Sequence, residues 1–299
     1  MKVTDNTRFL TLSVIKEWDK LTLENLFKFW KSPKKMVHEW RMSKLVAING
    51  QPASWNTALK EGDILNIPLL ENEGTSVPAE DLGIQVLYED EHLLIANKPA
   101  MMSTHPNSEG DKGTLLNGVA HHLSLTDQPG YIKHIHRLDK DTTGAVLFAK
   151  HPLAGALLDK MLEERHIKRT YLAWAEGLIT NDRGTVNQKI GRDRHHPTRR
   201  RVSPGGQTAV THYQVITRDR KQKLTLISCT LDTGRTHQIR VHMSHLGHPL
   251  AGDCLYGGRP LFKRQALHAR KIEFSHPFTG RFITCEAPFL DNPPIFKEL

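Results

Sequence analysis

The sequence predicts an α+β fold that consists of a small N-terminal domain and a larger second domain. Residues 12–70 combine two short helical patterns with short strand patterns, and longer alternations of apolar and polar residues follow. Between them, residues 71–82 are acidic and small and include a proline, as is typical of a linker. We therefore expect domains at 1–75 and 83–299, joined by a linker at 76–82.

The composition favours a polyanionic partner. The 299 residues include 41 Lys and Arg against 32 Asp and Glu, which gives a net charge of +9 and a pI near 9.4. This balance favours nucleic acid over an anionic membrane surface, although a basic protein without such a partner has the same composition. Three widely spaced cysteines argue against a disulfide framework, and no apolar stretch reaches the ~18–20 residues of a membrane span. We expect a cytoplasmic monomer outside the membrane.

The N-terminal domain is predicted to contain two helices and short strands. Thr22 can cap the first helix, and Ser32 followed by Pro33 can begin the second. Short strands are expected at 46–48, before the Asn49-Gly50 turn, and at 64–67, after the Gly62-Asp63 turn. The outer face of the second helix presents three basic candidates for RNA contact, Lys34, Lys35 and Arg41. A basic helix face is more often simply solvated, so both interpretations stay open.

The second domain is predicted to contain many strands and few helices. The expected strands cover 85–88, 92–96, 132–138, 145–149, 168–175, 208–216, 224–231, 267–274 and 281–287. Helices are expected at 114–123 and 151–165, and a third is expected to begin at Thr236. The strand at 145–149 is continuously apolar and should be fully buried, whereas 132–138 alternates and should be half-buried.

The nonapeptide 136–144 connects those two strands and is the first candidate for chemistry. Arg137 and Asp139 lie two residues apart on one face, at the lip of a buried strand, and the following Asp-Thr-Thr-Gly is typical of a turn. Such a pair can act on a molecule outside the sheet. The same spacing is equally compatible with a salt-bridged hairpin that has no chemistry.

Four motifs in a fixed order resemble those of the RluA family of RNA pseudouridine synthases. They are His-Arg-Leu-Asp at 136–139, Lys-Arg-Thr-Tyr at 168–171, Thr-Gly-Arg-Thr-His-Gln-Ile-Arg at 233–240, and Gly-His-Pro-Leu-Ala-Gly-Asp at 247–253. The resemblance covers about residues 84–290. It implies a mixed, largely antiparallel sheet flanked by helices, the pseudouridine synthase fold. It also implies the isomerisation of uridine in RNA, in which the base is detached from ribose, turned over and rejoined through carbon.

The N-terminal domain loosely resembles the alpha-L RNA-binding domain of small-subunit ribosomal proteins. The match depends on the basic helix and the Val-x-Ile-Asn-Gly turn, and the usual opening Arg-Leu-Asp of the first helix is absent. Because many bacterial RluA-family enzymes carry this domain, the resemblance favours large-subunit ribosomal RNA as substrate, with tRNA as the alternative. A catalytically silent RNA-binding or ribosome assembly factor is a further alternative.

The resemblance makes Asp139 the catalytic residue and Tyr171 the stacking surface for a flipped base. A dry carboxylate needs a cation partner. Arg240 is the first choice for that partner and Arg235 the second, and either could instead contact phosphate. Arg137 is expected to help displace the extruded nucleotide, or else to form a structural ion pair. The neighbouring His136 is a further candidate for RNA contact.

The segment 191–201 is too basic for a core and is predicted to project as a loop. Its candidates for phosphate contact are Arg199, Arg200 and Arg201, and the segment offers only Asp193 as an anion. A solvated loop without RNA contact is the alternative. In the loop after Pro99, Met101 stands where the family usually has glycine, which makes the backbone there harder to predict.

No metal or cofactor is expected, because uridine isomerisation needs neither. The 18 histidines allow the rival hypothesis of a metal-dependent hydrolase, but no carboxylate or cysteine completes a zinc-binding pattern in the sequence.

Overall fold

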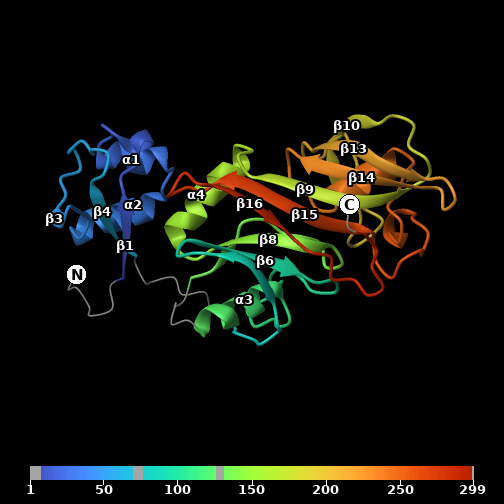
Figure 1. The fold of residues 1–299 in the computed structure, drawn as a ribbon, viewed down its shortest axis with the longest axis horizontal. Helices are drawn as coiled ribbons and strands as arrows, with labels where there is room; N and C mark the ends of the chain where they lie inside the picture. Colours follow the sequence, from blue (N-terminus) through green and yellow to red (C-terminus); the bar gives the residue numbers. More distant parts are fainter. Residues whose placement is uncertain (1–7, 70–76, 126–130, 298–299) are drawn as a thin grey trace.

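The computed structural model describes residues 8–69, 77–125 and 131–297 (Figure 1). In these residues a four-stranded sheet organises the N-terminal part, a ten-stranded sheet organises the remainder, and two further strands form a separate ladder. The predicted linker at 76–82 begins in the segment 70–76, which lies outside the described residues. The domain boundaries therefore stay a prediction.

The N-terminal part contains short strands and two amphipathic helices. Its strands are β1 (Arg8–Ser13), β2 (Ala47–Ile48), β3 (Gln51–Pro52) and β4 (Ile64–Leu69), in the antiparallel order β1-β4-β2-β3. Its helices are the 3-10 turn η1 (Lys16–Trp18), α1 (Leu23–Phe29) and α2 (Lys34–Ser43). Thr22 caps α1 as expected, because the Asn25 N–H donates to its hydroxyl at 3.2 Å. The prediction of Ser32 as the cap of α2 is wrong, since Pro33 occupies that position.

The N-terminal part docks against the larger part of the molecule (Figure 1). The Trp30 and Phe278 rings meet edge to face with their centroids 6.3 Å apart. At the rim, the Lys31 ammonium lies 3.2 Å from the Glu164 carboxylate. Buried apolar side chains from both parts form one continuous cluster, so that the two sheets share a hydrophobic contact.

The larger part is a mixed sheet with helices on its faces. Its strands are β5 (Gln85–Glu89), β6 (Leu93–Lys98), β7 (Lys133–His134), β8 (Thr143–Ala149), β9 (Lys168–Glu176), β10 (Arg183–Asn187), β13 (Val210–Asp219), β14 (Leu224–Leu231), β15 (Leu267–Ser275) and β16 (Phe282–Glu286). The main path runs β10-β13-β14-β9-β15-β8-β6-β5. β8 and β15 pair in parallel, and the other pairs of strands described here are antiparallel. This confirms the expected fold class.

Three helices and one 3-10 turn complete this part, namely α3 (Leu115–Ser124), α4 (Pro152–Glu163), α5 (Gln238–His245) and η2 (Cys254–Tyr256). Alternate residues of β8 face opposite sides of the sheet. Leu147 joins the apolar cluster that contains α4, whereas Phe148 joins the cluster that contains α3. Because both faces of β8 are covered, its whole length is buried, and this explains the continuous apolar run at 145–149.

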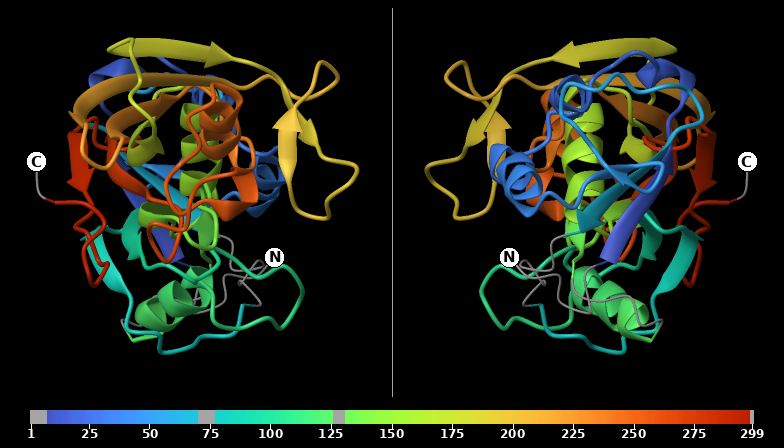
Figure 2. Two further views of the ribbon diagram at one scale, coloured as in Figure 1. Left: turned by 90° about the vertical axis from the view of Figure 1, so that its right-hand side faces the viewer. Right: turned by 90° about the vertical axis from the view of Figure 1, so that its left-hand side faces the viewer.

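Three further predictions about local structure are wrong in whole or in part. The strand expected at 132–138 is only the two-residue β7, and residues 136–139 leave the sheet. The third helix begins at Gln238, after His237 in a left-handed conformation, and Thr236 does not cap it. The segment 191–201 is a hairpin formed by β11 (Ile190–Arg192) and β12 (Arg200–Val202), which extends from one side of the molecule (Figure 2).

Candidate active site

Asp139 lies in a turn that long-range contacts hold in place. The Leu138 N–H donates to the Thr104 hydroxyl at 3.1 Å, and this hydroxyl in turn donates to the Leu138 carbonyl at 3.0 Å. The Thr142 N–H donates to the Asp139 carbonyl, which turns the chain into β8. At Gly144, φ is +114° and a Cβ atom would lie 2.2 Å from the Ala269 carbonyl oxygen, so only glycine fits.

The Asp139 carboxylate shares one arginine with a second carboxylate. Arg240 Nη1 donates to Asp139 Oδ2 at 3.0 Å, and the Nε and Nη2 atoms donate to Asp253 at 2.7 and 2.8 Å. Burial alone would lower the pKa of Arg240, but the bonds to Asp253 and the charge of Asp139 raise it above its usual value. Arg240 is therefore a fixed cation, and the trio keeps a net negative charge that faces the pocket through Asp139.

The choice of Arg240 over Arg235 as the partner of Asp139 agrees with this geometry. Arg235 is exposed and donates instead to the Thr208 carbonyl at 3.1 Å and the Gln207 side chain at 3.3 Å. Asp253 was not predicted as a site residue, although it is the last residue of the motif at 247–253. Asp253 lies 13 residues after Arg240, and no local sequence pattern indicates a contact over that separation.

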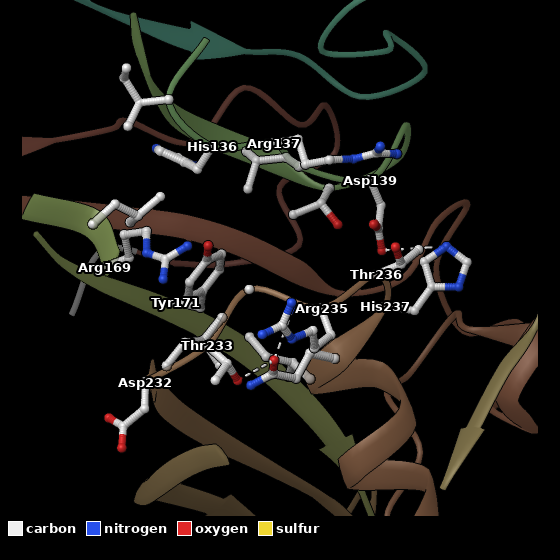
Figure 3. Close-up of a pocket in the computed structure, with 18 of the residues that line it drawn as sticks. His136, Arg137, Asp139, Arg169, Tyr171, Asp232, Thr233, Arg235, Thr236 and His237 are labelled. Carbon is white, nitrogen blue, oxygen red and sulfur yellow. Dashed lines mark hydrogen bonds and ion pairs between the residues drawn. The ribbon is translucent and has the colours of Figure 1, made fainter. Parts of the chain in front are cut away.

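A pocket of about 650 Å³ opens beside Asp139 (Figure 3). Tyr171 of β9 forms part of its wall with only 4% of its surface exposed, and burial raises the pKa of its hydroxyl. Figure 3 shows the Tyr171 ring between Arg169 on one side and Asp139 on the other. A planar base that enters the pocket can therefore lie against an aromatic ring while its sugar stays near the carboxylate.

Lys98, at the end of β6, ties the loop that follows it to the turn of Asp139. Its fully buried ammonium donates to the carbonyls of Pro99, Met102 and Lys140 at 2.9, 2.7 and 2.8 Å. Burial lowers the pKa of Lys98 to about 7, although Asp139 raises it. Met101 lies between Pro99 and Met102 in the chain and has φ +63°, a left-handed conformation that glycine adopts more readily than methionine.

His237 stands next to Asp139 in a strained backbone conformation, with φ +60°. Its Nε2 atom lies 3.9 Å from Asp139 Oδ2, and its Nδ1 atom lies 2.8 Å from the Tyr256 hydroxyl. The Tyr256 hydroxyl also accepts the Arg200 N–H at 2.9 Å, which connects the hairpin 190–202 to the pocket. Burial lowers the pKa of His237, so the ring is neutral near pH 7.

Two further residues of the His-Arg-Leu-Asp motif differ in exposure. Arg137 is exposed at the rim of the pocket, and Figure 3 shows its side chain extending past Asp139. His136 is buried and accepts the Leu147 N–H at 3.2 Å. Burial, together with the charge of Arg169, lowers the pKa of His136 well below its usual value. His136 thus lines the pocket as a neutral ring and presents no charge to RNA.

The arginines of the hairpin have three different environments. Arg199 is bound to Asp193 through two contacts of 2.7 and 2.6 Å, and it lowers the pKa of that carboxyl. Arg200 is partly buried, whereas Arg201 is exposed. Asp193, the only acidic residue of the segment 191–201, is therefore bound by Arg199.

The basic candidates of the N-terminal part, Lys34, Lys35 and Arg41, are exposed on α2. Arg41 stacks on the Trp55 ring at 4.6 Å. Lys35 lines a second, smaller groove between α2 and α4. All three lie on the surface of the domain and away from the pocket of Asp139.

Among the described residues, no three His, Cys, Asp or Glu side chains are grouped closely enough to hold a metal ion. No helix in this part of the chain has the length and apolar character needed to cross a membrane.

Comparisons with known proteins agree with the geometry. Residues 92–245 match the family model for RNA pseudouridylate synthase, and residues 10–65 match the model for the N-terminal domain of the ribosomal pseudouridine synthase RluD. The chain is similar to the uncharacterized RNA pseudouridine synthase YhcT of Bacillus subtilis, with 50% identity over 87% of this chain and 86% of the relative.

Other relatives and one solved structure extend this result. A ribosomal large subunit pseudouridine synthase D from Nitrosomonas europaea is 38% identical over 85% of this chain and 76% of its own length. The structure of human RNA pseudouridylate synthase domain containing 1 superposes with a TM-score of 0.58 at 24% identity, over 71% of this chain and 85% of that chain, which shows a shared fold. The chain belongs to the RNA pseudouridylate synthase family and is an RNA pseudouridine synthase.

Proposed function

We propose that this synthase isomerises uridine in large-subunit ribosomal RNA, with Asp139 as its catalytic carboxylate. The match of residues 10–65 to a ribosomal synthase domain and the names of several relatives support the substrate. The single observation that carries the catalytic assignment is the Asp139 carboxylate, held 3.0 Å from Arg240 at the edge of the pocket that contains Tyr171. Such a substrate agrees with the cytoplasmic location that the cysteine pattern predicts.

The arrangement suggests how the reaction proceeds. The uridine leaves its RNA stack and its base lies against Tyr171, which places the bond between ribose C1′ and uracil N1 near Asp139. Attack by the carboxylate on the sugar or on the ring, or assistance to loss of the base, then breaks that bond. Arg240 keeps the carboxylate in place, and Asp253 keeps Arg240 in place.

RNA contact is assigned to exposed cations. Arg137 and Arg235 flank the pocket, and Arg201 lies on the nearby hairpin. On the N-terminal part, Lys34, Lys35 and Arg41 offer a separate basic surface. Exposed cations suit phosphate contact, which gives affinity without base specificity.

The test is the mapping of pseudouridine after incubation of the purified enzyme with unmodified transcripts of large-subunit RNA, small-subunit RNA and tRNA. We expect modification at one or a few uridines of the large-subunit transcript and none in the other two. Modification confined to tRNA would reject the ribosomal substrate. Equal product from the wild type and the Asp139→Asn variant would reject the catalytic assignment.

A further inference from the structure

Arg169 is a buried cation without a carboxylate partner in the described part of the chain. Only 7% of its surface is exposed, and its Nε atom is buried without a hydrogen bond. It lies two residues before Tyr171 on β9, so both side chains point to the same face and line the same pocket. Arg240, in the same pocket, contacts two carboxylates.

The burial of a guanidinium without a carboxylate partner is energetically unfavourable. A guanidinium does not lose its proton under physiological conditions, and a buried ion without a partner costs several kcal/mol. Of the carboxylates that line this pocket, Asp232 binds Arg165 at 3.2 Å and His212 at 3.3 Å, and Asp159 binds Lys133 at 2.5 Å. No ion pair of Arg169 is found among the described residues, so its side of the pocket carries a positive charge, and the Asp139 side carries the excess negative charge.

The approach to Arg169 is also shaped by a glycine. A Cβ atom at Gly234 would lie 3.3 Å from Arg169 Nη1, so a larger residue there would press on the guanidinium. Gly234 itself lines the pocket beside Arg169. The guanidinium thus lies against Gly234 in the pocket that Tyr171 also lines.

The reaction generates a negative charge on the detached uracil base, which suits the positive side of the pocket at Arg169. When the C1′–N1 bond breaks, its electron pair stays with uracil and is shared among N1, C5, O2 and O4, and C1′ is left cationic or bonded to the Asp139 carboxylate. When C5 then bonds to C1′, an electron pair of the anion forms the new bond, and any bond between C1′ and Asp139 breaks with its electrons returning to the carboxylate. C5 loses one proton and N1 gains one. The reaction needs no oxidant or reductant. It does need the detached base to be held and its charge stabilised, and Asp139 is itself negative and cannot do this.

We propose that Arg169 binds the carbonyl edge of the flipped uracil and stabilises the uracil anion while the base is detached from ribose. The inference rests on the proposed function of the pocket and makes Arg169 a further catalytic residue. A preorganised donor in a dry site stabilises a developing anion strongly, because the donor needs no rearrangement at the moment of reaction. A phosphate contact is less favoured, since the RNA backbone stays outside while the base enters.

The test uses the full chain and an unmodified large-subunit RNA transcript that carries radiolabelled uracil. Arg169→Met removes the charge and Arg169→Lys keeps it. Arg259→Gln is the control, because Arg259 is an exposed arginine that is bound to Glu176 at 2.7 Å and is not among the residues that line this pocket. Single-turnover rate at saturating RNA, RNA affinity and released free uracil are measured for each variant.

We expect Arg169→Met to lower the single-turnover rate at least 100-fold with RNA affinity within threefold, and to release free uracil that the wild type retains. The rate of Arg169→Lys should be at least tenfold higher than that of Arg169→Met, and the rate of Arg259→Gln should stay within threefold of the wild type. If Arg169→Met does not fold, Arg169→Gln is judged by the same criteria.

Two results would overturn the inference. One is an unchanged rate with weaker binding and a salt slope lower by about 0.7–0.9, which would identify a phosphate contact. The other is a slower rate without free uracil and without recovery in Arg169→Lys, which would identify a structural role. Either result leaves the proposed function intact, because that fails only if the wild type forms no pseudouridine in this RNA or Asp139→Asn still forms it.

Discussion

The pocket and the basic surface of this enzyme use charged residues in opposite ways. In the pocket, Arg240, Asp139 and Asp253 are fixed to one another at 2.7–3.0 Å. On the surface, Lys34 and Arg201 are exposed. A buried charge acts through its exact position and partner, whereas exposed charges act through their number. Substitutions in the two regions should therefore change different measured quantities, namely rate in the pocket and salt dependence on the surface.

The largest effect is expected for Asp139→Asn. The amide keeps the size of the side chain but can act neither as nucleophile nor as base, so isomerisation should fall below a hundredth of the wild-type rate. RNA affinity should stay within a few-fold, because phosphate contacts carry most of it. Single-turnover rate and binding are measured on the same transcript. A rate above that limit in a clean preparation would mean that the pocket does not act through Asp139.

An intermediate effect, on the salt dependence of RNA affinity, is expected for the hairpin 190–202. Arg201 and Arg199 provide a matched pair of substitutions there. Arg201→Ala should lower the slope of log affinity against log salt by about 0.7–0.9, the contribution of one phosphate contact. Arg199→Ala should leave the slope unchanged, because Asp193 already holds that guanidinium. Binding is measured between low and moderate salt with target and non-target RNA, and both should respond equally. A loss confined to the target would show that the hairpin contacts bases.

The smallest effect is expected for Met101→Gly, a surface change that acts on the backbone and not on charge. The left-handed conformation costs a side-chain-bearing residue roughly 1–2 kcal/mol, and glycine adds roughly 0.5–1 kcal/mol of unfolded-state entropy. The free energy of unfolding should therefore rise by about 0.5–1 kcal/mol in denaturant titrations. Met101→Ala keeps the strain and should give no gain. A loss of stability in the glycine variant would show that the exposed methionine side chain matters more than its φ.

Much of the fold could be predicted because local signals were sufficient. The continuous apolar run of β8 and the cap at Thr22 are complete in a short window of sequence, and both are confirmed. The alternation at 132–138 predicted a strand that is absent beyond β7, because Leu138 bonds to Thr104, 34 residues away, instead of to a neighbouring strand. No local pattern contains that information.

The site could be predicted where a single motif indicates the role of a residue. It could not be predicted where the role depends on contacts between segments that are distant in the sequence. The pairing of Arg240 with Asp139 followed from the need of a dry carboxylate for a cation. Asp253 and His237 lie inside the quoted motifs, but only their contacts with Arg240 and Asp139 show what they do. Arg169 was missed for the opposite reason, since its lack of a carboxylate partner among the described residues is visible only in three dimensions.

The parallel pairing of β8 with β15 also has a consequence for synthesis of the protein. Thr143, next to the turn of Asp139, is bonded to His268 at a separation of 125 residues, and Gly144 pairs with Ala269. Contacts this distant along the chain close large loops and form slowly. The nascent chain can form its N-terminal sheet early, but the turn of Asp139 lacks its neighbour strand until β15 has left the ribosome. Catalytic competence is thereby acquired only after β15 has been synthesised.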